Sequence, residues 1–203
     1  MKIHSHQGTQ RGQAGFTVLE AVIAISLMAL LLVNVSMLTE SASSQQSATN
    51  RQLQLDQLCR RAVDRMANEL LEASYEHTVP LIEAPASTAD ISYLTSLGYS
   101  DGEEVLSPME NILLDSEAAQ ILWIENPGEL DERQIVLSSN VSQLMLGEEA
   151  GNLKDDNENF VVDEAGLALH VDGRIIVIEL TLRKIFSEQE FVSTAKAEVC
   201  FRN

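Results

Sequence analysis

The chain has 203 residues, two cysteines and a formal charge of −18, so its length suits one membrane helix plus one modest domain. The acidic charge argues against nucleic-acid binding, because contacts to phosphates need Lys and Arg. It also argues against docking on anionic lipid headgroups, and it is compatible with solubility, cation binding or a basic protein partner.

The N-terminal region combines a short polar leader, residues 1–15, with an apolar run over residues 16–38. A helix over that run spans roughly 35 Å at about 1.5 Å per residue, enough for a bilayer core of about 30 Å. One carboxylate, Glu20, interrupts the run. A charge at membrane depth costs roughly 2.5–3.5 kcal/mol and usually marks function. The alternative is an ordinary single-span anchor whose Glu20 reaches the membrane interface.

The order of polar leader, Gly15, Phe16 and Glu20 in a hydrophobic helix resembles the type IV prepilin motif, shared by pilins and the pseudopilins of type II secretion. The resemblance implies that a prepilin peptidase cuts between Gly15 and Phe16 and N-methylates Phe16. The apolar segment then stays on the mature chain, whereas a secretory signal is removed with its apolar region. The resemblance also implies that Glu20 pairs with the new α-amino group of a neighbouring Phe16 and sets the register between subunits.

The charges of the leader predict the orientation in the membrane. Lys2 and Arg11 favour a cytoplasmic N-terminus, which places the C-terminal domain in the periplasm. We therefore expect a single-pass protein of the inner (cytoplasmic) membrane that enters a periplasmic or surface filament after processing.

Beyond residue 38 the sequence turns polar but contains no Pro or Gly that would stop a helix. Apolar residues then recur in steps of three and four from Leu55 to Ala73, which indicates one helical face. We predict one helix from about residue 16 to about residue 74, with residues 39–75 as its periplasmic half. An unwound joint in the Ser- and Gln-rich stretch is the alternative.

Residues 76–203 are predicted to form a β-rich globular domain. We expect irregular structure over 76–118, with a short helix near 109–114, and a hairpin around a type I′ turn at Asp172-Gly173. One face of the second hairpin arm, from Ile176 to Leu182, should meet the helix. The predicted strands cover residues 120–125, 134–138, 141–146, 167–171, 174–184 and 191–201. The fold class is α+β and pilin-like, with a long N-terminal helix on an antiparallel sheet.

Weaker features sharpen the resemblance to the J-type minor pseudopilins. They are the helical segment 59–66 (CRRAVDRM), the segment 155–167 and the ending Phe201-Arg202-Asn203. In that family, J-type proteins join other minor pseudopilins in a tip complex that primes filament growth.

The acidic segment near residue 160 is a candidate calcium loop. Its oxygen side chains match positions 1, 3, 5 and 9 of an EF-hand-like loop, and Ca²⁺ takes six to eight oxygen ligands. Two departures oppose this hypothesis, because Phe160 replaces the turn glycine and Gly166 replaces the closing glutamate. An acidic, solvated turn without metal is the alternative, and no other cofactor is predicted. The candidate ligands are Asp155, Asn157, Asn159, Asp163 and, as a substitute for the closing glutamate, Glu164.

Cys59 lies on the predicted helix and Cys200 on the polar face of the last predicted strand. A periplasmic location permits a disulfide, but this facing favours two unpaired thiols. Both possibilities stay open. A Gly-x-Ser-x-Gly pattern at residues 98–102 lacks the helix that a nucleophile elbow requires, so we interpret it as a turn.

The sequence therefore predicts a non-enzymatic minor pilin or pseudopilin. Its expected partners are the prepilin peptidase, other pilin or pseudopilin subunits, the inner-membrane assembly platform and membrane lipid, with no nucleic acid. The alternative is a membrane-tethered periplasmic binding or calcium-sensing domain that does not polymerise.

Overall fold

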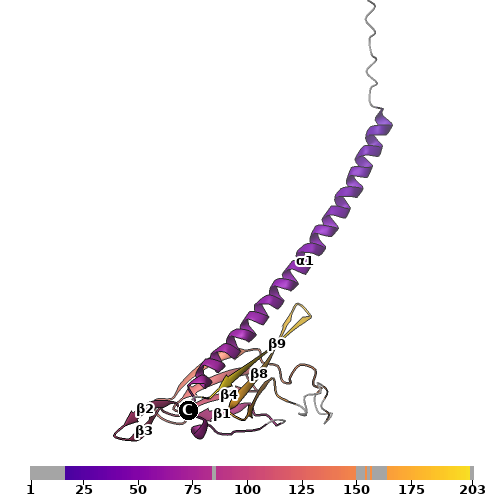
Figure 1. The fold of residues 1–203 in the computed structure, drawn as a ribbon. Coiled ribbons are helices and arrows are strands. Elements are labelled where there is room, and N and C mark those ends of the chain that lie inside the picture. The colour runs from indigo at the N-terminus through magenta and orange to yellow at the C-terminus, as the bar shows by residue number, and fades with distance from the viewer. Residues whose placement is uncertain (1–16, 84–85, 150–153, 155, 157–163, 202–203) are drawn as a thin grey trace, which may run out of the picture. The chain divides into compact units, whose positions relative to one another are not determined.

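A computed structural model describes residues 17–83, 86–149, 154, 156 and 164–201 of the chain. Their contacts divide the chain into two compact units, residues 1–48 and 49–203. A single helix, α1 (Val18–Leu71), begins in the first unit and ends in the second (Figure 1). The prediction of one long helix is confirmed, because the Ser- and Gln-rich stretch is helical throughout rather than an unwound joint.

The described part of the second unit contains nine strands in three antiparallel sheets. The strand orders are β1-β4-β5-β6, β2-β3 and β7-β8-β9. A short 3-10 helix, η1 (Tyr75–His77), follows α1. The strands are β1 (Asp90–Tyr93), β2 (Ser96–Ser100), β3 (Glu103–Leu106), β4 (Glu110–Asp115), β5 (Gln120–Glu125), β6 (Arg133–Ser139), β7 (Leu167–Asp172), β8 (Ile175–Phe186) and β9 (Gln189–Cys200). The α+β class with antiparallel sheets is confirmed.

Within the second unit, the last part of α1 packs on the β7-β8-β9 sheet. The Cys59 thiol contacts the backbone oxygens of Leu180 and Ser193 at 3.4 and 3.6 Å, and the Gln52 amide donates to the Val192 carbonyl oxygen at 2.9 Å. The predicted apolar face of β8 is buried as expected. Its members, Ile176, Ile178, Leu180 and Leu182, are each at most 1% exposed.

Three local predictions in the globular domain are wrong. Residues 110–115 form strand β4 instead of the expected helix near 109–114, because each of them pairs with a residue of β5. The region predicted to be irregular also contains β1 and the β2–β3 pair. The expected strand at 141–146 is reduced to one bridge between Val141 and Leu182.

One tight turn differs from expectation in its type. In the β7–β8 hairpin, Asp172 pairs with Ile175, so the central turn residues are Gly173 and Arg174. Positive φ falls on Gly173, at 62°, and not on Arg174. That pattern belongs to a type II′ turn, so the predicted type I′ turn is wrong here.

The type I′ pattern occurs in the β2–β3 hairpin, where Asp101 and Gly102 have φ values of 53° and 87°. A strand, β3, follows Ser100 after this turn. The Gly-x-Ser-x-Gly pattern is therefore a hairpin and lacks the strand-turn-helix context of a nucleophile elbow.

Candidate functional site

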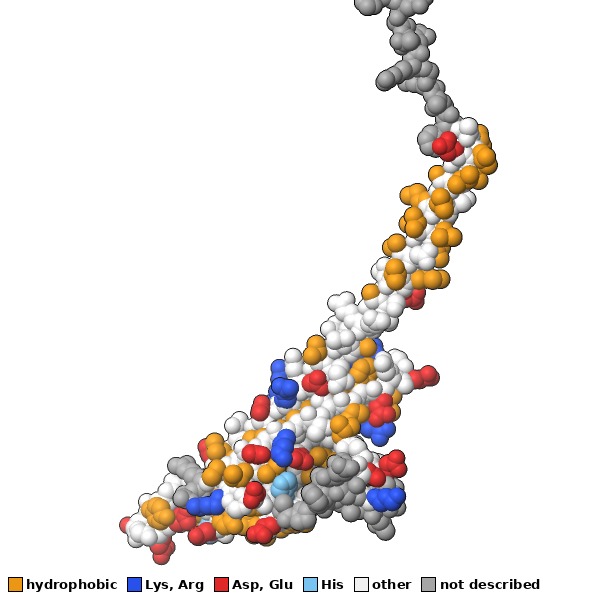
Figure 2. Space-filling model, turned by 45° about the vertical axis from the view of Figure 1, so that its right-hand side comes forward, with side chains coloured by type: hydrophobic (Ala, Val, Ile, Leu, Met, Phe, Trp, Pro, Cys, Tyr) orange, Lys and Arg blue, Asp and Glu red, His pale blue; other side chains and the backbone are white. Residues whose placement is uncertain are grey.

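The first part of α1 carries the strongest functional pattern. Its most apolar 18-residue window has a mean hydropathy of 2.5, and none of that window is buried. By length and composition this helix is able to cross a membrane. Figure 2 shows hydrophobic side chains along the visible face of the N-terminal part of α1. Such a helix needs lipid or other apolar surfaces as its environment.

Glu20 lies in the first turn of α1, three residues after Thr17. The Glu20 amide donates to the Thr17 side-chain oxygen at 3.3 Å, so Thr17 acts as the N-cap. A Thr with Glu three residues later is the capping-box pattern, and a carboxylate in the first turn also stabilises the helix dipole. Thr17 caps the helix and Glu20 occupies the capping-box position in the first turn, so local helix stabilisation is a second physical role for Glu20 that the sequence analysis missed.

Three other polar side chains of the apolar segment form hydrogen bonds within the helix. Ser26, Asn34 and Thr39 donate to the carbonyl oxygens of Val22, Leu30 and Val35, each at 2.8 Å. Bonds to the fourth preceding carbonyl remove most of the cost of placing such groups in lipid. Glu20 is the one ionisable residue from Val18 to Thr39. The predicted processing residues, Gly15 and Phe16, lie outside the described residues.

The candidate calcium loop lies mostly outside the described residues, and this includes Asp155, Asn157, Asn159 and Asp163. Glu164, the proposed substitute ligand, is buried with 6% exposure, and its backbone oxygen accepts from the Met145 amide at 3.0 Å. In the part of the chain that the structure describes, His, Cys, Asp and Glu form no group of three that could hold a metal.

The two cysteines are both free thiols. Cys59 is buried and contacts Ser193, whereas Cys200 is exposed at the end of the same strand. At about 3.3 Å per residue, Cys200 lies roughly 20 Å along β9 from that contact. A disulfide needs Cα atoms within about 7 Å, so the structure does not form a Cys59–Cys200 bridge. Burial raises the pKa of the Cys59 thiol.

A half-buried polar cluster in the second unit was also missed by the sequence analysis. The Trp123 indole donates to the Tyr93 hydroxyl and to a Glu110 carboxylate oxygen, both at 3.1 Å. Burial and the nearby Glu110 charge raise the pKa of Tyr93 well above its usual range. The phenol therefore stays protonated at neutral pH. Because the three residues come from β1, β4 and β5, sequence spacing alone gave no signal of their proximity.

No protein-family model, curated protein or solved structure matches this chain.

Proposed function

We propose that this protein is a non-enzymatic minor pilin or pseudopilin subunit. In this proposal, prepilin peptidase cleaves the chain after Gly15 and methylates Phe16, and an inner-membrane platform assembles it with other pilin or pseudopilin subunits. The resulting filament is a type II secretion pseudopilus or a type IV pilus-like fibre. The C-terminal domain lies in the periplasm.

The observation that carries the proposal is the chemistry of the first part of α1. An exposed apolar helix with one carboxylate near its start follows a polar leader that ends in Gly15. In an anchor that only holds a domain in the membrane, a charge in this segment costs insertion energy and brings only the local stabilisation of the helix start. A subunit that must match the amino terminus of its neighbour gains a specific ion pair there. Removing one partner of such a desolvated pair is costly.

The capping role of Glu20 makes a sharp experiment possible. Glu20→Gln keeps a side chain suited to the third position of a capping box but removes the charge, whereas Thr17→Ala removes the cap but keeps the charge. If Glu20 pairs with a neighbouring amino terminus, Glu20→Gln should reduce the sheared-filament fraction about tenfold or more. Thr17→Ala should leave most assembly intact.

The controls separate assembly from membrane insertion and from capping. The membrane-bound amount of each variant should match wild type, and Asn34→Ala should assemble normally because its side chain bonds only within its own helix. Equal loss with Thr17→Ala and Glu20→Gln would assign Glu20 to capping alone. Normal assembly of Glu20→Gln would refute the ion pair, and absence of the wild-type chain from the sheared-filament fraction would favour the alternative of a tethered domain that does not polymerise.

A further inference from the structure

The folded unit of residues 49–203 has a groove between the last part of α1 and the edge strand β6. We call it the α1–β6 groove. Its volume is about 260 Å³, and its lining combines apolar, arginine and backbone groups. The lining residues are Leu58, Arg61, Ala62, Arg65 and the segment from Val136 to Ser139.

One wall of the groove is an open sheet edge. β6 is the last strand of its sheet and, among the described strands, pairs only with β5. Two large apolar residues on it, Ile135 and Val136, are 50% and 48% exposed. An exposed apolar edge strand offers unpaired amide and carbonyl groups to another strand, and proteins usually protect such edges with charge or cover. This edge is a template for strand addition.

The other wall is basic, although the chain as a whole is acidic. Arg61 and Arg65 are exposed on α1, and neither forms an ion pair with any residue that the structure describes. Arg133 stands at the start of β6 and reaches Glu125 at 3.6 Å. On a chain with a formal charge of −18, this arrangement favours an acidic partner with apolar side chains.

The chain itself carries a surface of that chemistry, on the β2–β3 hairpin that extends at one end of the folded unit (Figure 1). Leu97 and Tyr99 on β2 are 65% and 78% exposed, and Val105 on β3 is 40% exposed. Asp101 and Glu103, at the tip, are exposed as well. Among the described strands, β2 and β3 pair only with each other, so each of them has an open edge.

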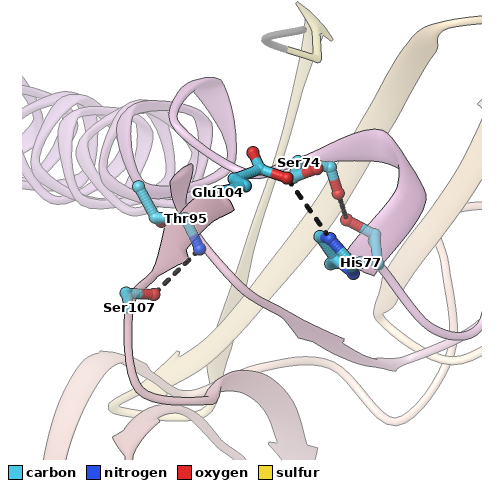
Figure 3. Close-up of polar contacts among 6 residues, drawn as sticks. Ser74, His77, Thr95, Glu104 and Ser107 are labelled. Carbon is cyan, nitrogen blue, oxygen red and sulfur yellow. Dashed lines mark hydrogen bonds and ion pairs between the residues drawn. The ribbon is translucent and has the colours of Figure 1, made fainter. Parts of the chain in front are cut away.

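The base of this hairpin is held in place before any partner arrives. His77 of η1 lies 3.7 Å from the Glu104 carboxylate, and the Thr95 amide donates to the Ser107 hydroxyl at 2.8 Å (Figure 3). The Ser107 amide returns a bond to the Thr95 carbonyl oxygen at 2.8 Å. A surface that is already ordered loses less entropy when it docks.

We infer that the β2–β3 hairpin of one copy docks in the α1–β6 groove of a second copy, adding its strands to the β6 edge. Tyr99 pairs with Glu104 and Val105 pairs with Gly98, so these two apolar residues lie on opposite faces of the hairpin. One of the two faces covers the apolar lining of the groove, and the acidic tip meets Arg61 and Arg65. Since the two surfaces differ, the contact is heterologous and extends head to tail. The inference does not depend on processing or filament assembly, and it needs only that α1 holds both copies in one membrane.

The contact is small, since each hairpin strand is only four or five residues long. An interface of this size is weak between free molecules. It becomes populated when both copies share one membrane, because tethering raises the effective concentration. The test therefore uses full-length chains in membranes.

The experiment co-expresses two differently tagged copies that both carry Cys200→Ser, which leaves the buried Cys59 as the remaining native thiol. One copy carries Val136→Cys in the groove, and the other carries Tyr99→Cys or Val105→Cys in the hairpin. We expect at least one pair to form a mixed disulfide dimer on mild oxidation. The matched control replaces the hairpin cysteine with Glu129→Cys, at an exposed loop position. No link from either hairpin position, or an equal link from the control, would overturn the inference.

A charge exchange tests the specificity of the contact. Arg65→Glu in the groove copy, or Glu103→Arg in the hairpin copy, should each lower the yield of the mixed dimer several-fold. The two changes together should restore it, which also shows that neither variant is misfolded. A mixed-dimer yield that stays unchanged with either single substitution and with both together would contradict docking by charge complementarity.

Discussion

Gly166 lies just before β7, where two segments of backbone approach each other closely. A Cβ atom at this position would overlap the Ser142 carbonyl oxygen and lie 2.9 Å from the Ser142 carbonyl carbon. The same two residues bond to one partner, since Gly166 accepts from the Thr181 amide at 2.7 Å and Ser142 donates to the Thr181 carbonyl oxygen at 2.9 Å. This packing explains the glycine at a position where a calcium loop would have its closing glutamate.

We expect Gly166→Ala to destabilise the folded unit by about 1–3 kcal/mol, because the backbone must move to admit one methyl group. Chemical unfolding of the detergent-solubilised full chain, followed by Trp123 fluorescence, measures the change. Adding Ser142→Gly should not restore stability, since the clash is with backbone atoms. A wild-type unfolding midpoint for Gly166→Ala would refute the close approach.

Glu69 lies on α1 near the cluster of Tyr93, Trp123 and Glu110. Burial, and then the charges of Glu110 and Glu72, raise the pKa of Glu69 above its ordinary value of 4.5. The folded protein therefore holds this proton to higher pH than the unfolded chain does. The stabilising contribution of this carboxyl is complete below pH 4.5 and is lost as the pH rises through the raised pKa.

It follows that Glu69→Gln should stabilise the chain at pH 7 and have little effect below about pH 4.5. The gain is small, about 0.5 kcal/mol or less, because the side chain is partly exposed and solvent screens the repulsion. Unfolding free energies at pH 4 and pH 7 test it, with Asp64→Asn as a control that removes one exposed charge from the same helix. If Glu69→Gln raised the unfolding free energy more at pH 4 than at pH 7, the result would contradict a raised pKa for Glu69.

At the scale of the element, α1 has two environments along one continuous helix. In residues 18–38 its large hydrophobic side chains are exposed, whereas in the second unit a narrow stripe is buried. The steps of three and four residues predicted this stripe correctly, because helix periodicity is a local property of the sequence. The buried members are Leu55, Cys59, Ala62, Val63, Met66 and Leu70.

This division predicts different costs for equal truncations on one helix. Met66 is 0% exposed and Leu53 is 52% exposed. Met66→Ala should cost about 2–5 kcal/mol, because it leaves a cavity in the core, and Leu53→Ala should cost well under about 1 kcal/mol. Denaturant titrations of the two variants provide the comparison. Similar costs for both would mean that the helix does not pack on the sheet along this stripe.

The elements that sequence patterns failed to predict are those fixed by distant partners. Residues 110–115 became β4 because β1 and β5 pair with them on both sides, which no local periodicity reveals. Residues 141–146 have strand-like composition, yet within this segment only Val141 forms a β-bridge, with Leu182 of β8. The long hairpin of β7 and β8 was predicted correctly, because its alternating strands and its turn are adjacent in the sequence. The type of that turn was predicted wrongly.

At the scale of the whole molecule, sequence composition predicted some features of the protein and not others. The apolar run predicted a helix able to cross a membrane, and the lone carboxylate within that run singled out Glu20. The capping contact with Thr17 and the Tyr93–Trp123–Glu110 cluster were beyond the reach of sequence patterns, because they depend on backbone geometry and on pairing between strands.

The central claim is that the mature chain begins at an amino group able to meet Glu20 of a neighbour. Intact-mass and N-terminal peptide analysis of the protein extracted from host membranes tests this claim most directly. The account predicts a chain that starts at N-methylated Phe16, and a precursor that accumulates uncut when Gly15 is replaced by Ala. A membrane-extracted chain that still starts at Met1 would contradict it.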